Sequence, residues 1–408
     1  MSRSLSLLRN RYVASILLSN VFSQFGIWVR NLAVLLEAMK RTGGDAFAVS
    51  MISVAEYAPI FAFSFIGGVF ADRWRPKKTV VRCEILSAIS VFAVLGEFAA
   101  GSWQAVFAAT LVSSILSQFA QPSGMKLFKQ HVRDEDAQIC MSMLQIIMSV
   151  FLTAGPVLGT FVYGQWGMKP ALLLTGAAFL LSALALRFIP ADPAMREAAE
   201  APVRSSLLSD MADGLRYVWR KPDLLRLSLC FALVGFGVGL ISPLGMFVVT
   251  ERLGLSTENL PWITVPYGVG EMIGGMATFL LAAKVAPARL LALGLLVNGA
   301  GILVTGRSAV LWLTMAAQFV LAFLQPAIFI GNNALVMRQT DPAYIGRVTG
   351  IRTPLMTGAM LLSMGCAGIL KDALSLTGVY ALACACFWAG WLAVVPPLRP
   401  ADSRGETR

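Results

Sequence analysis

The chain has 408 residues, of which 57% are apolar and 13% are charged, and its formal net charge is +11. Ordinary soluble domains contain about 25% charged residues, so this composition predicts a chain embedded in lipid. The basic residues are scattered over short segments and form no continuous run, which argues against nucleic-acid binding.

Histidine and cysteine usage argues against enzyme chemistry. His131 is the only histidine, so a His-dependent triad or a multi-histidine metal site is not expected. The six cysteines fall in or beside apolar segments without metal-ligand spacing and are interpreted as small buried hydrophobes. The sequence therefore predicts no enzyme, no metal and no cofactor.

Twelve apolar segments are long enough to cross a hydrocarbon layer of about 30 Å, at about 1.5 Å of rise per helical residue. In chain order they are Tyr12–Ala38, Ala46–Ala71, Thr79–Ala100, Trp103–Leu127, Gln138–Tyr163, Met168–Ile189, Leu224–Val249, Pro261–Ala283, Arg289–Thr305, Ala309–Met337, Val348–Leu370 and Leu374–Val395. The prediction is an all-α membrane protein with twelve transmembrane helices.

The placement of Lys and Arg supports this count. With both termini in the cytoplasm, 26 of the 33 basic residues fall on the cytoplasmic side and 6 on the outer side, and Arg30 lies inside the first span. Such an excess on one side is the positive-inside bias of membrane proteins. We therefore expect a multi-pass protein of a bacterial inner membrane with cytoplasmic termini.

The longest polar stretch, residues 190–223, divides the chain into six spans before it and six after it. Its second part places apolar residues on one helical stripe, which predicts an amphipathic helix on the inner leaflet. It is interpreted either as a tether that couples two moving halves or as a solubilising spacer. Gln121-Pro122 recurs as Gln325-Pro326, 204 residues later, which favours two pseudo-symmetric six-helix bundles, 1–189 and 224–408.

Three ionisable residues lie deep in predicted spans, where each costs roughly 2.5–3.5 kcal/mol to insert. Arg30 and Glu56 lie at similar depths in the first two spans, so they can pair, and Glu271 lies in the middle of the eighth. In the functional interpretation Glu56 or Glu271 is the protonated carboxyl of an antiporter, and Arg30 tunes it or meets an anionic substrate. The alternative is a buried structural pair plus one neutral glutamic acid.

The chain resembles the major facilitator superfamily of transporters along essentially its whole length. The resemblance rests on the six-plus-six layout, on the G-x-x-x-D-R-x-x-x-K-K loop after the second span, and on a G-P-x-x-G element of exporters in the fifth. The residues that carry it are Gly68, Asp72, Arg73, Lys77, Lys78, Gly155, Pro156 and Gly159. Within the superfamily, the first and fourth spans look most like enterobactin-type siderophore exporters and macrolide-efflux proteins.

The resemblance implies a gating latch in the loop. In that fold Asp72 lies near the N-terminus of the eleventh span, whose partial positive charge favours a carboxylate by about 0.3–1 kcal/mol. Arg352 can strengthen this contact, and Gly68 allows close helix approach. A plain positive-inside loop is the alternative, but it does not explain Asp72 and Gly68 at this spacing.

The resemblance also implies that the first, fourth, seventh and tenth spans line a central cavity. The candidate substrate-binding residues on these spans are Gln24, Arg30, Gln118, Gln121, Gln318 and Gln325. Hydrogen bonding between helices is the competing explanation for such polar residues.

The resulting prediction is an exporter of an amphiphilic organic compound, either a siderophore or a drug-like molecule. We expect a monomer that exchanges substrate for protons by alternating access. The alternatives are an importer or lipid flippase of the same fold, or a membrane receptor or scaffold that transports nothing.

Overall fold

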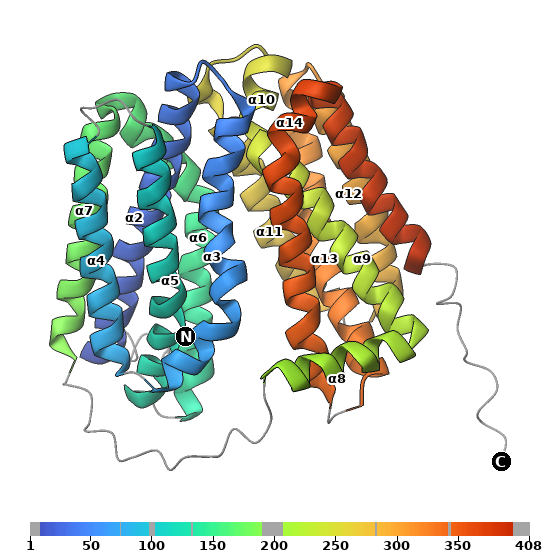
Figure 1. Ribbon diagram of the computed structural model, residues 1–408, viewed down its shortest axis with the longest axis horizontal. Coiled ribbons are helices and arrows are strands. Elements are labelled where there is room, and N and C mark those ends of the chain that lie inside the picture. Colours follow the sequence, from blue (N-terminus) through green and yellow to red (C-terminus); the bar gives the residue numbers. More distant parts are fainter. Residues whose placement is uncertain are drawn as a thin grey trace. The chain divides into compact units, whose positions relative to one another are not determined.

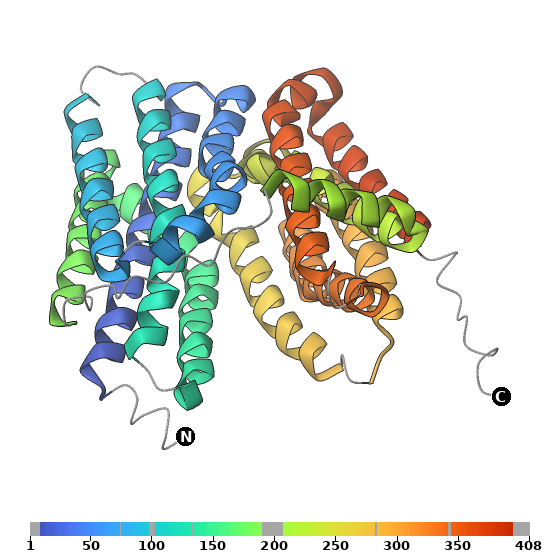
Figure 2. The same ribbon diagram turned by 60° about the horizontal axis from the view of Figure 1, so that its bottom comes forward.

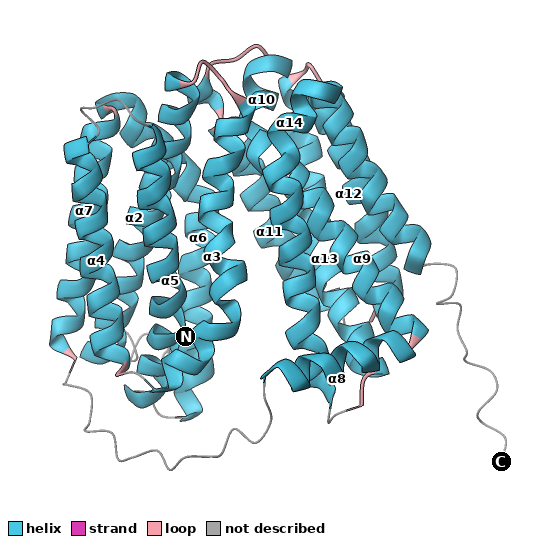
Figure 3. Ribbon diagram, in the orientation of Figure 1, coloured by secondary structure: helices cyan, strands magenta, loops and turns pink. Residues whose placement is uncertain are grey.

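The computed structural model describes residues 9–73, 75–97, 103–131, 134–189, 207–281, 284–341 and 344–394. Throughout these ranges the chain is helical, with only short turns between helices and no strand (Figure 3). It divides into two compact units, Met1–Ala201 and Pro202–Arg408. Each unit is described by itself.

The first unit contains six long helices that match the first six predicted spans (Figure 1). They are α2 (Arg11–Arg41), α3 (Ala46–Arg73), α4 (Pro76–Glu97), α5 (Trp103–His131), α6 (Asp134–Trp166) and α7 (Met168–Ala185). The side chain of Asn10 caps α2 by accepting a 2.9 Å hydrogen bond from the backbone N–H of Tyr12. Two glycines with positive φ, Gly43 and Gly44, then turn the chain into α3.

Helix α2 forms the centre of the first unit, because it packs against both α6 and α7. Helix α5 packs against α3 and α4, and α4 also contacts α7. One apolar cluster includes Val29 and Ala33 of α2 with Phe179 of α7, and a second surrounds Val13 and Leu127. These contacts fix the helices that carry the candidate residues of this unit.

The second unit begins with a short helix, α8 (Leu207–Arg220), and continues with long helices. These are α9 (Pro222–Ile241), α11 (Pro261–Leu281), α12 (Pro287–Arg307), α13 (Leu311–Gln339) and α14 (Ile345–Val394). After Ile241 the chain stays helical to Arg252 through a 3-10 turn at Ser242–Leu244, the single turn α10 (Gly245–Phe247) and a π turn at Val248–Arg252. Pro243 lacks a backbone N–H, which accounts for the change of helix type.

Helix α14 is two spans joined without a loop. Ser375 has φ 67° and ψ 164°, which breaks the helix at this residue. Its hydroxyl then accepts a 3.4 Å hydrogen bond from the N–H of Gly378 and so caps the final helix. With this break, the described residues contain twelve long helices, which confirms the predicted fold class.

Close glycine contacts hold the second unit together. Gly235 and Gly239 of α9 lie directly against the backbone carbonyls of Met356 and Met360 of α14, where an added methyl group would overlap those oxygens. This G-x-x-x-G spacing places both glycines on one face of the helix and allows two backbones to approach. The pairs α12–α13 and α11–α13 complete the packing of this unit.

Helix surfaces agree with a membrane environment. Eight helical segments of the described chain combine the length and the hydropathy needed to cross a membrane. Large apolar side chains lie exposed along them, among them Phe161, Phe279, Trp312 and Leu362. Exposed apolar surface of this extent marks contact with lipid or a partner.

Candidate functional site

A buried polar chain connects Arg30 of α2 to Glu56 of α3. The Arg30 Nε and Nη2 atoms donate hydrogen bonds of 3.1 and 2.8 Å to Asn31 Oδ1, and Asn31 Nδ2 donates to the Glu56 carboxylate. The sequence predicted that Arg30 and Glu56 can pair; in the structure the hydrogen bonds between them run through Asn31. Arg30 is only 4% exposed, and its Nη1 has no hydrogen-bond partner among the described residues. A buried charge with unused donors is costly, so this arrangement needs a functional or structural reason.

The G-P-x-x-G element of α6 packs beside this chain. Gly155 lies against the indole of Trp28 of α2, and Gly159 lies against Leu32 and the carbonyl oxygen of Trp28. Trp28 and Leu32 flank Arg30 by two residues on either side. Pro156 is buried inside α6. The element therefore sets the distance between α6 and the segment of α2 that carries Arg30.

A second polar group ties α2 to α6 near the end of α2. The Tyr163 hydroxyl donates a 2.7 Å hydrogen bond to Glu37 Oε2, and Arg41 Nε donates one of 2.6 Å to Glu37 Oε1. Glu37 is buried, whereas Arg41 is partly exposed. Neither Glu37 nor Tyr163 was among the predicted site residues.

Another buried carboxyl, Glu84 of α4, lies among serine hydroxyls. The Ser23 hydroxyl of α2 donates a 2.9 Å hydrogen bond to Glu84 Oε1. Nearby, the hydroxyls of Ser19 and Ser182 lie 2.8 Å apart and join α2 to α7. This group binds three helices of the first unit together and was not among the predicted site residues.

The predicted glutamines of the first unit differ in their surroundings. Gln24 is half-buried on α2. Gln118 donates within its own helix, to the Ser114 carbonyl at 3.5 Å and the Ser117 hydroxyl at 3.3 Å. The Gln121 side chain lies outside the described residues. Unlike Gln118, Gln24 has no hydrogen bond to another described residue.

In the second unit Glu271 lies half-buried at the contact of α11 with α13. Gly270 and Gly274, which flank it, lie against the backbone carbonyls of Phe319 and Phe323 of α13. One turn before Glu271, the Tyr267 hydroxyl donates a 2.7 Å hydrogen bond to Gln325 Oε1. Tyr267 was not among the predicted site residues, although its i, i+4 spacing from Glu271 places both on one face of α11.

Gln318 of α13 is half-buried, like Gln325. The two are seven residues apart, so they share one side of α13. Gln325 accepts the hydrogen bond from Tyr267 of α11, and Gln318 lies two turns before Gln325 on α13.

Arg352 of α14 is buried at 4% exposure and is engaged within its own unit. Its Nη2 donates to the Asn332 side chain of α13, and its guanidinium lies 5.1 Å from the centre of the Phe231 ring of α9. Asn332 Nδ2 in turn donates a 3.2 Å hydrogen bond to the Leu227 carbonyl. Arg352 thus joins three helices of the second unit.

The loop motif is described only in part. Gly68, Asp72 and Arg73 lie in the last turns of α3, and their side chains lie outside the described residues. Lys77 donates to the backbone carbonyl of Ile189, and Lys78 is exposed. Pro76 begins α4, a position that suits proline because the first helical N–H has no partner within the helix.

The described residues contain no group of three or more His, Cys, Asp or Glu side chains able to hold a metal ion. The polar groups above are carboxyls, guanidiniums and amides inside long apolar helices. Ionisable residues in such helices are costly to bury and are therefore candidates for a functional site.

Three comparisons place the chain among known transporters. It is 25% identical over 375 residues to the MFS-type transporter YkuC of Bacillus subtilis, covering 90% of this chain and 87% of the relative. It is also 25% identical over 375 residues to the multidrug efflux pump Tap of Mycolicibacterium fortuitum, covering 88% and 90% of the two chains. The crystal structure of the nucleoside transporter NupG superposes with a TM-score of 0.73 over 94% of this chain and 98% of that one. At 14% identity this last likeness shows the fold alone.

The family model described as Major Facilitator Superfamily matches residues 16–286, which is more than half of the chain. The match runs from α2 through α11, so it covers nearly all of the first unit and the first part of the second. The chain therefore belongs to the Major Facilitator Superfamily of membrane transporters.

Proposed function

We propose that this transporter exports an amphiphilic, drug-like organic compound across a bacterial inner membrane in exchange for protons. The similarity to the multidrug efflux pump Tap over most of both chains supports the substrate class and the direction. The excess of basic residues on one side supports an orientation with both termini in the cytoplasm.

The observation that carries the proton coupling is the Arg30–Asn31–Glu56 chain. An ionised Glu56 accepts from Asn31, which in turn accepts from Arg30. Protonation of Glu56 removes the negative charge that balances Arg30 through Asn31. Arg30 then becomes available for an electron-rich group of the substrate, so binding and protonation compete.

Glu271 supplies the corresponding carboxyl of the second unit in this proposal. It lies beside the Tyr267–Gln325 hydrogen bond, which offers polar contacts one turn away. The gating residues of the loop motif, Gly68, Asp72, Arg73, Lys77 and Lys78, belong to the same proposal, as do Gly155, Pro156 and Gly159 of α6 and Arg352 of α14. We also propose that the protein functions as a monomer.

The test is transport in inverted membrane vesicles with an imposed pH gradient, screened against lipophilic cations and siderophores. We expect accumulation of a lipophilic compound, collapse on addition of a protonophore, and a loss of at least about tenfold in both Glu56→Gln and Glu271→Gln. Glu258→Gln, at an exposed glutamate outside the long helices, is the matched control. Full gradient-driven transport by the double variant Glu56→Gln/Glu271→Gln would exclude the proposed coupling.

The same experiment separates the alternatives. Accumulation of siderophores but not of lipophilic cations would assign the chain to siderophore export. Accumulation only in right-side-out vesicles would identify an importer, and movement of labelled phospholipid between leaflets would identify a flippase.

A further inference from the structure

Helix α8 crosses the ends of the long helices of the second unit. Figures 1 and 2 both show it lying across α14 rather than along it. It packs against α14 and α9. Gly214 lies against Arg347 and Ile351 of α14, and Val218 is only 3% exposed. One face of α8 is therefore fixed on the bundle, and its axis runs across the direction of the membrane-length helices.

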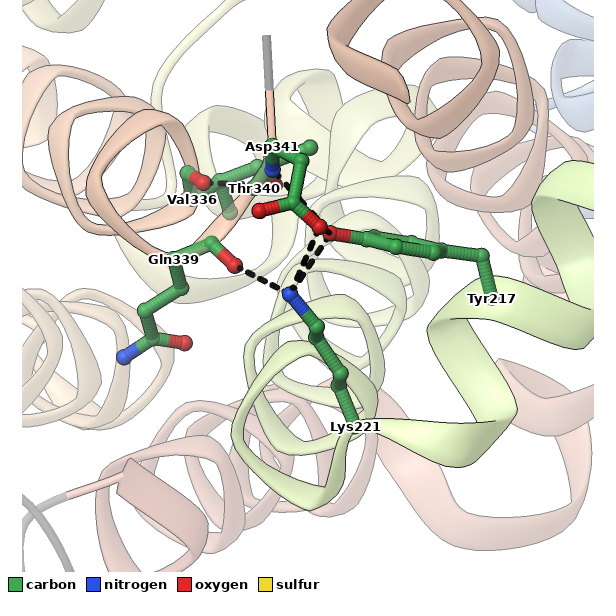
Figure 4. A network of polar contacts seen from close by, with 6 residues as sticks. All are labelled: Tyr217, Lys221, Val336, Gln339, Thr340 and Asp341. Atoms are coloured by element: carbon green, nitrogen blue, oxygen red, sulfur yellow. Dashed lines mark hydrogen bonds and ion pairs between the residues drawn. The ribbon is translucent and has the colours of Figure 1, made fainter. Parts of the chain in front are cut away.

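A polar clamp fixes α8 about its own axis (Figure 4). The Tyr217 ring stacks on Tyr344 with centroids 4.2 Å apart and an interplanar angle of 7°. The Tyr217 hydroxyl donates a 2.6 Å hydrogen bond to Asp341 Oδ2, and Lys221 Nζ donates to the same hydroxyl at 2.6 Å and to Asp341 Oδ2 at 3.2 Å. Lys221 also donates to the Gln339 carbonyl at 3.3 Å. The exposed faces of α8 therefore point in fixed directions.

Those exposed faces carry two pairs of residues at i, i+4 spacing. Leu215 is 51% exposed and Trp219 is 71% exposed. At about 100° per residue, this pair lies on a flank of α8, roughly a quarter to two-fifths of a turn from Gly214. Arg216 and Arg220, both exposed, lie on the side facing away from the bundle. No ion pair with a carboxylate is found for either arginine in the described chain.

We propose that this surface, formed by Leu215, Arg216, Trp219 and Arg220, docks on anionic phospholipid headgroups of the leaflet beside α8. Trp219 and Leu215 enter the boundary between headgroups and acyl chains, where an amphipathic aromatic ring is favoured. Arg216 and Arg220 bind the phosphates. Charge complementarity supports this occupant, because two exposed guanidiniums beside an apolar pair match a negatively charged lipid surface.

The apolar surface continues into the next helix. Helix α9 begins one residue after Lys221, and its Leu225 and Leu229 are 36% and 52% exposed. A side chain exposed on a membrane-length helix contacts acyl chains, so α8 lies at the level where these chains end. Because the clamp binds Tyr217 and Lys221 to Asp341, anchoring of α8 also restrains the connection between α13 and α14. Lipid binding at α8 therefore fixes the tilt of the second unit, whatever solute the protein carries.

The first test measures lipid selectivity with the full chain. Purified protein is released from vesicles of equal phosphatidylethanolamine and phosphatidylglycerol, and the lipids retained on it are counted by native mass spectrometry. Each arginine near an anionic surface contributes about 1 kcal/mol, or about fivefold in binding. We expect the preference for phosphatidylglycerol to fall by about 25-fold in Arg216→Gln/Arg220→Gln. The control Lys169→Gln/Arg307→Gln removes two exposed basic residues elsewhere, and we expect it to keep the preference.

The second test locates Trp219 directly and does not depend on the arginine variants. Tryptophan emission of the wild type and of Trp219→Phe is compared in nanodiscs with brominated or ordinary lipids. We expect the emission attributable to Trp219 to be quenched most by bromines near the headgroup. Unquenched Trp219 emission, or an unchanged lipid preference in a folded Arg216→Gln/Arg220→Gln variant, would overturn the proposal. Unquenched emission at short wavelength would show that protein covers this flank instead.

Discussion

Gly155 of α6 lies in direct contact with the indole of Trp28 of α2, two residues before Arg30. No side chain fits between them. The contact links the G-P-x-x-G element of α6 to the helix that carries Gln24 and Arg30, two of the proposed substrate residues.

Gly155→Ala is expected to displace Trp28 and with it the Arg30 segment. Overpacking in a well-packed core costs about 1–3 kcal/mol, so we expect a lower melting temperature in detergent and reduced transport. Gly164→Ala in the same helix is the control, because nothing lies within 4 Å of the position its methyl group would take. Equal melting temperatures for the two variants would contradict the close contact.

Asn31→Ala is expected to interrupt the connection between Arg30 and Glu56 without removing either charge. In the proposed mechanism this uncouples transport from the pH gradient, with a loss similar to that of Glu56→Gln. The measurement is gradient-driven uptake into inverted vesicles beside substrate binding without a gradient. Asn333→Ala, at an exposed asparagine of α13, serves as the control. If the Asn31→Ala variant keeps its gradient-driven uptake, Asn31 has no part in coupling transport to protons.

Asn332→Leu is expected to leave the buried Arg352 guanidinium without its acceptor. A lost hydrogen bond to a charged group costs about 1.5–3 kcal/mol. The double variant Arg352→Met/Asn332→Leu should recover part of this loss, because it removes the unpaired charge as well. Chemical unfolding of the single and double variants measures the coupling. Strictly additive losses would show that the two side chains do not depend on each other.

The Tyr217–Asp341–Lys221 clamp is expected to weaken at both extremes of pH. The hydrogen bond from Tyr217, followed by that from Lys221, lowers the pKa of Asp341. The hydrogen bond to Tyr217 raises the pKa of Lys221, and Asp341 adds to this effect. The Asp341 contribution is complete above the ordinary aspartate pKa and is lost as pH falls through the lowered value. The Lys221 contribution is complete below the ordinary lysine pKa and is lost as pH rises through the raised value.

A spin label on α8 reports this dependence. Asp213 is exposed on α8, and Cys366 is an exposed native cysteine, so the labelled protein is Asp213→Cys/Cys366→Ser. We expect low mobility of the label from mildly acidic to mildly basic pH and higher mobility in strong acid. Adding Asp341→Asn should give high mobility at neutral pH. If the mobility of the label changes neither with pH nor in the Asp341→Asn variant, the clamp does not hold α8.

The helices of this fold are readable from the sequence because lipid imposes long apolar runs. The predicted span Tyr12–Ala38 lies within α2 (Arg11–Arg41), and Met168–Ile189 covers α7 and the turn that follows. The joint between the last two spans was expected between Leu370 and Leu374, and the break is at Ser375. Only the backbone conformation of that residue shows that the two helices meet without a loop.

Partners of buried charges are harder to predict, because they depend on how one helix is rotated against another. The positions of Arg30 and Glu56 within their spans predicted that the two lie at the same depth, but they did not predict Asn31 between them. Arg352 was expected to serve a latch at the start of its helix, and the structure shows it donating to Asn332 under the ring of Phe231. Its part in a latch stays a prediction, as does that of Asp72.

The glycine contacts of α9 with α14 have a practical consequence. Because Gly235 and Gly239 leave no space between these backbones, the two helices cannot slide or separate without breaking the contact. A pair of distance probes placed one on each helix should report the same separation in every step of the transport cycle. Such a pair would serve as an internal ruler against which any real conformational change in this protein is calibrated.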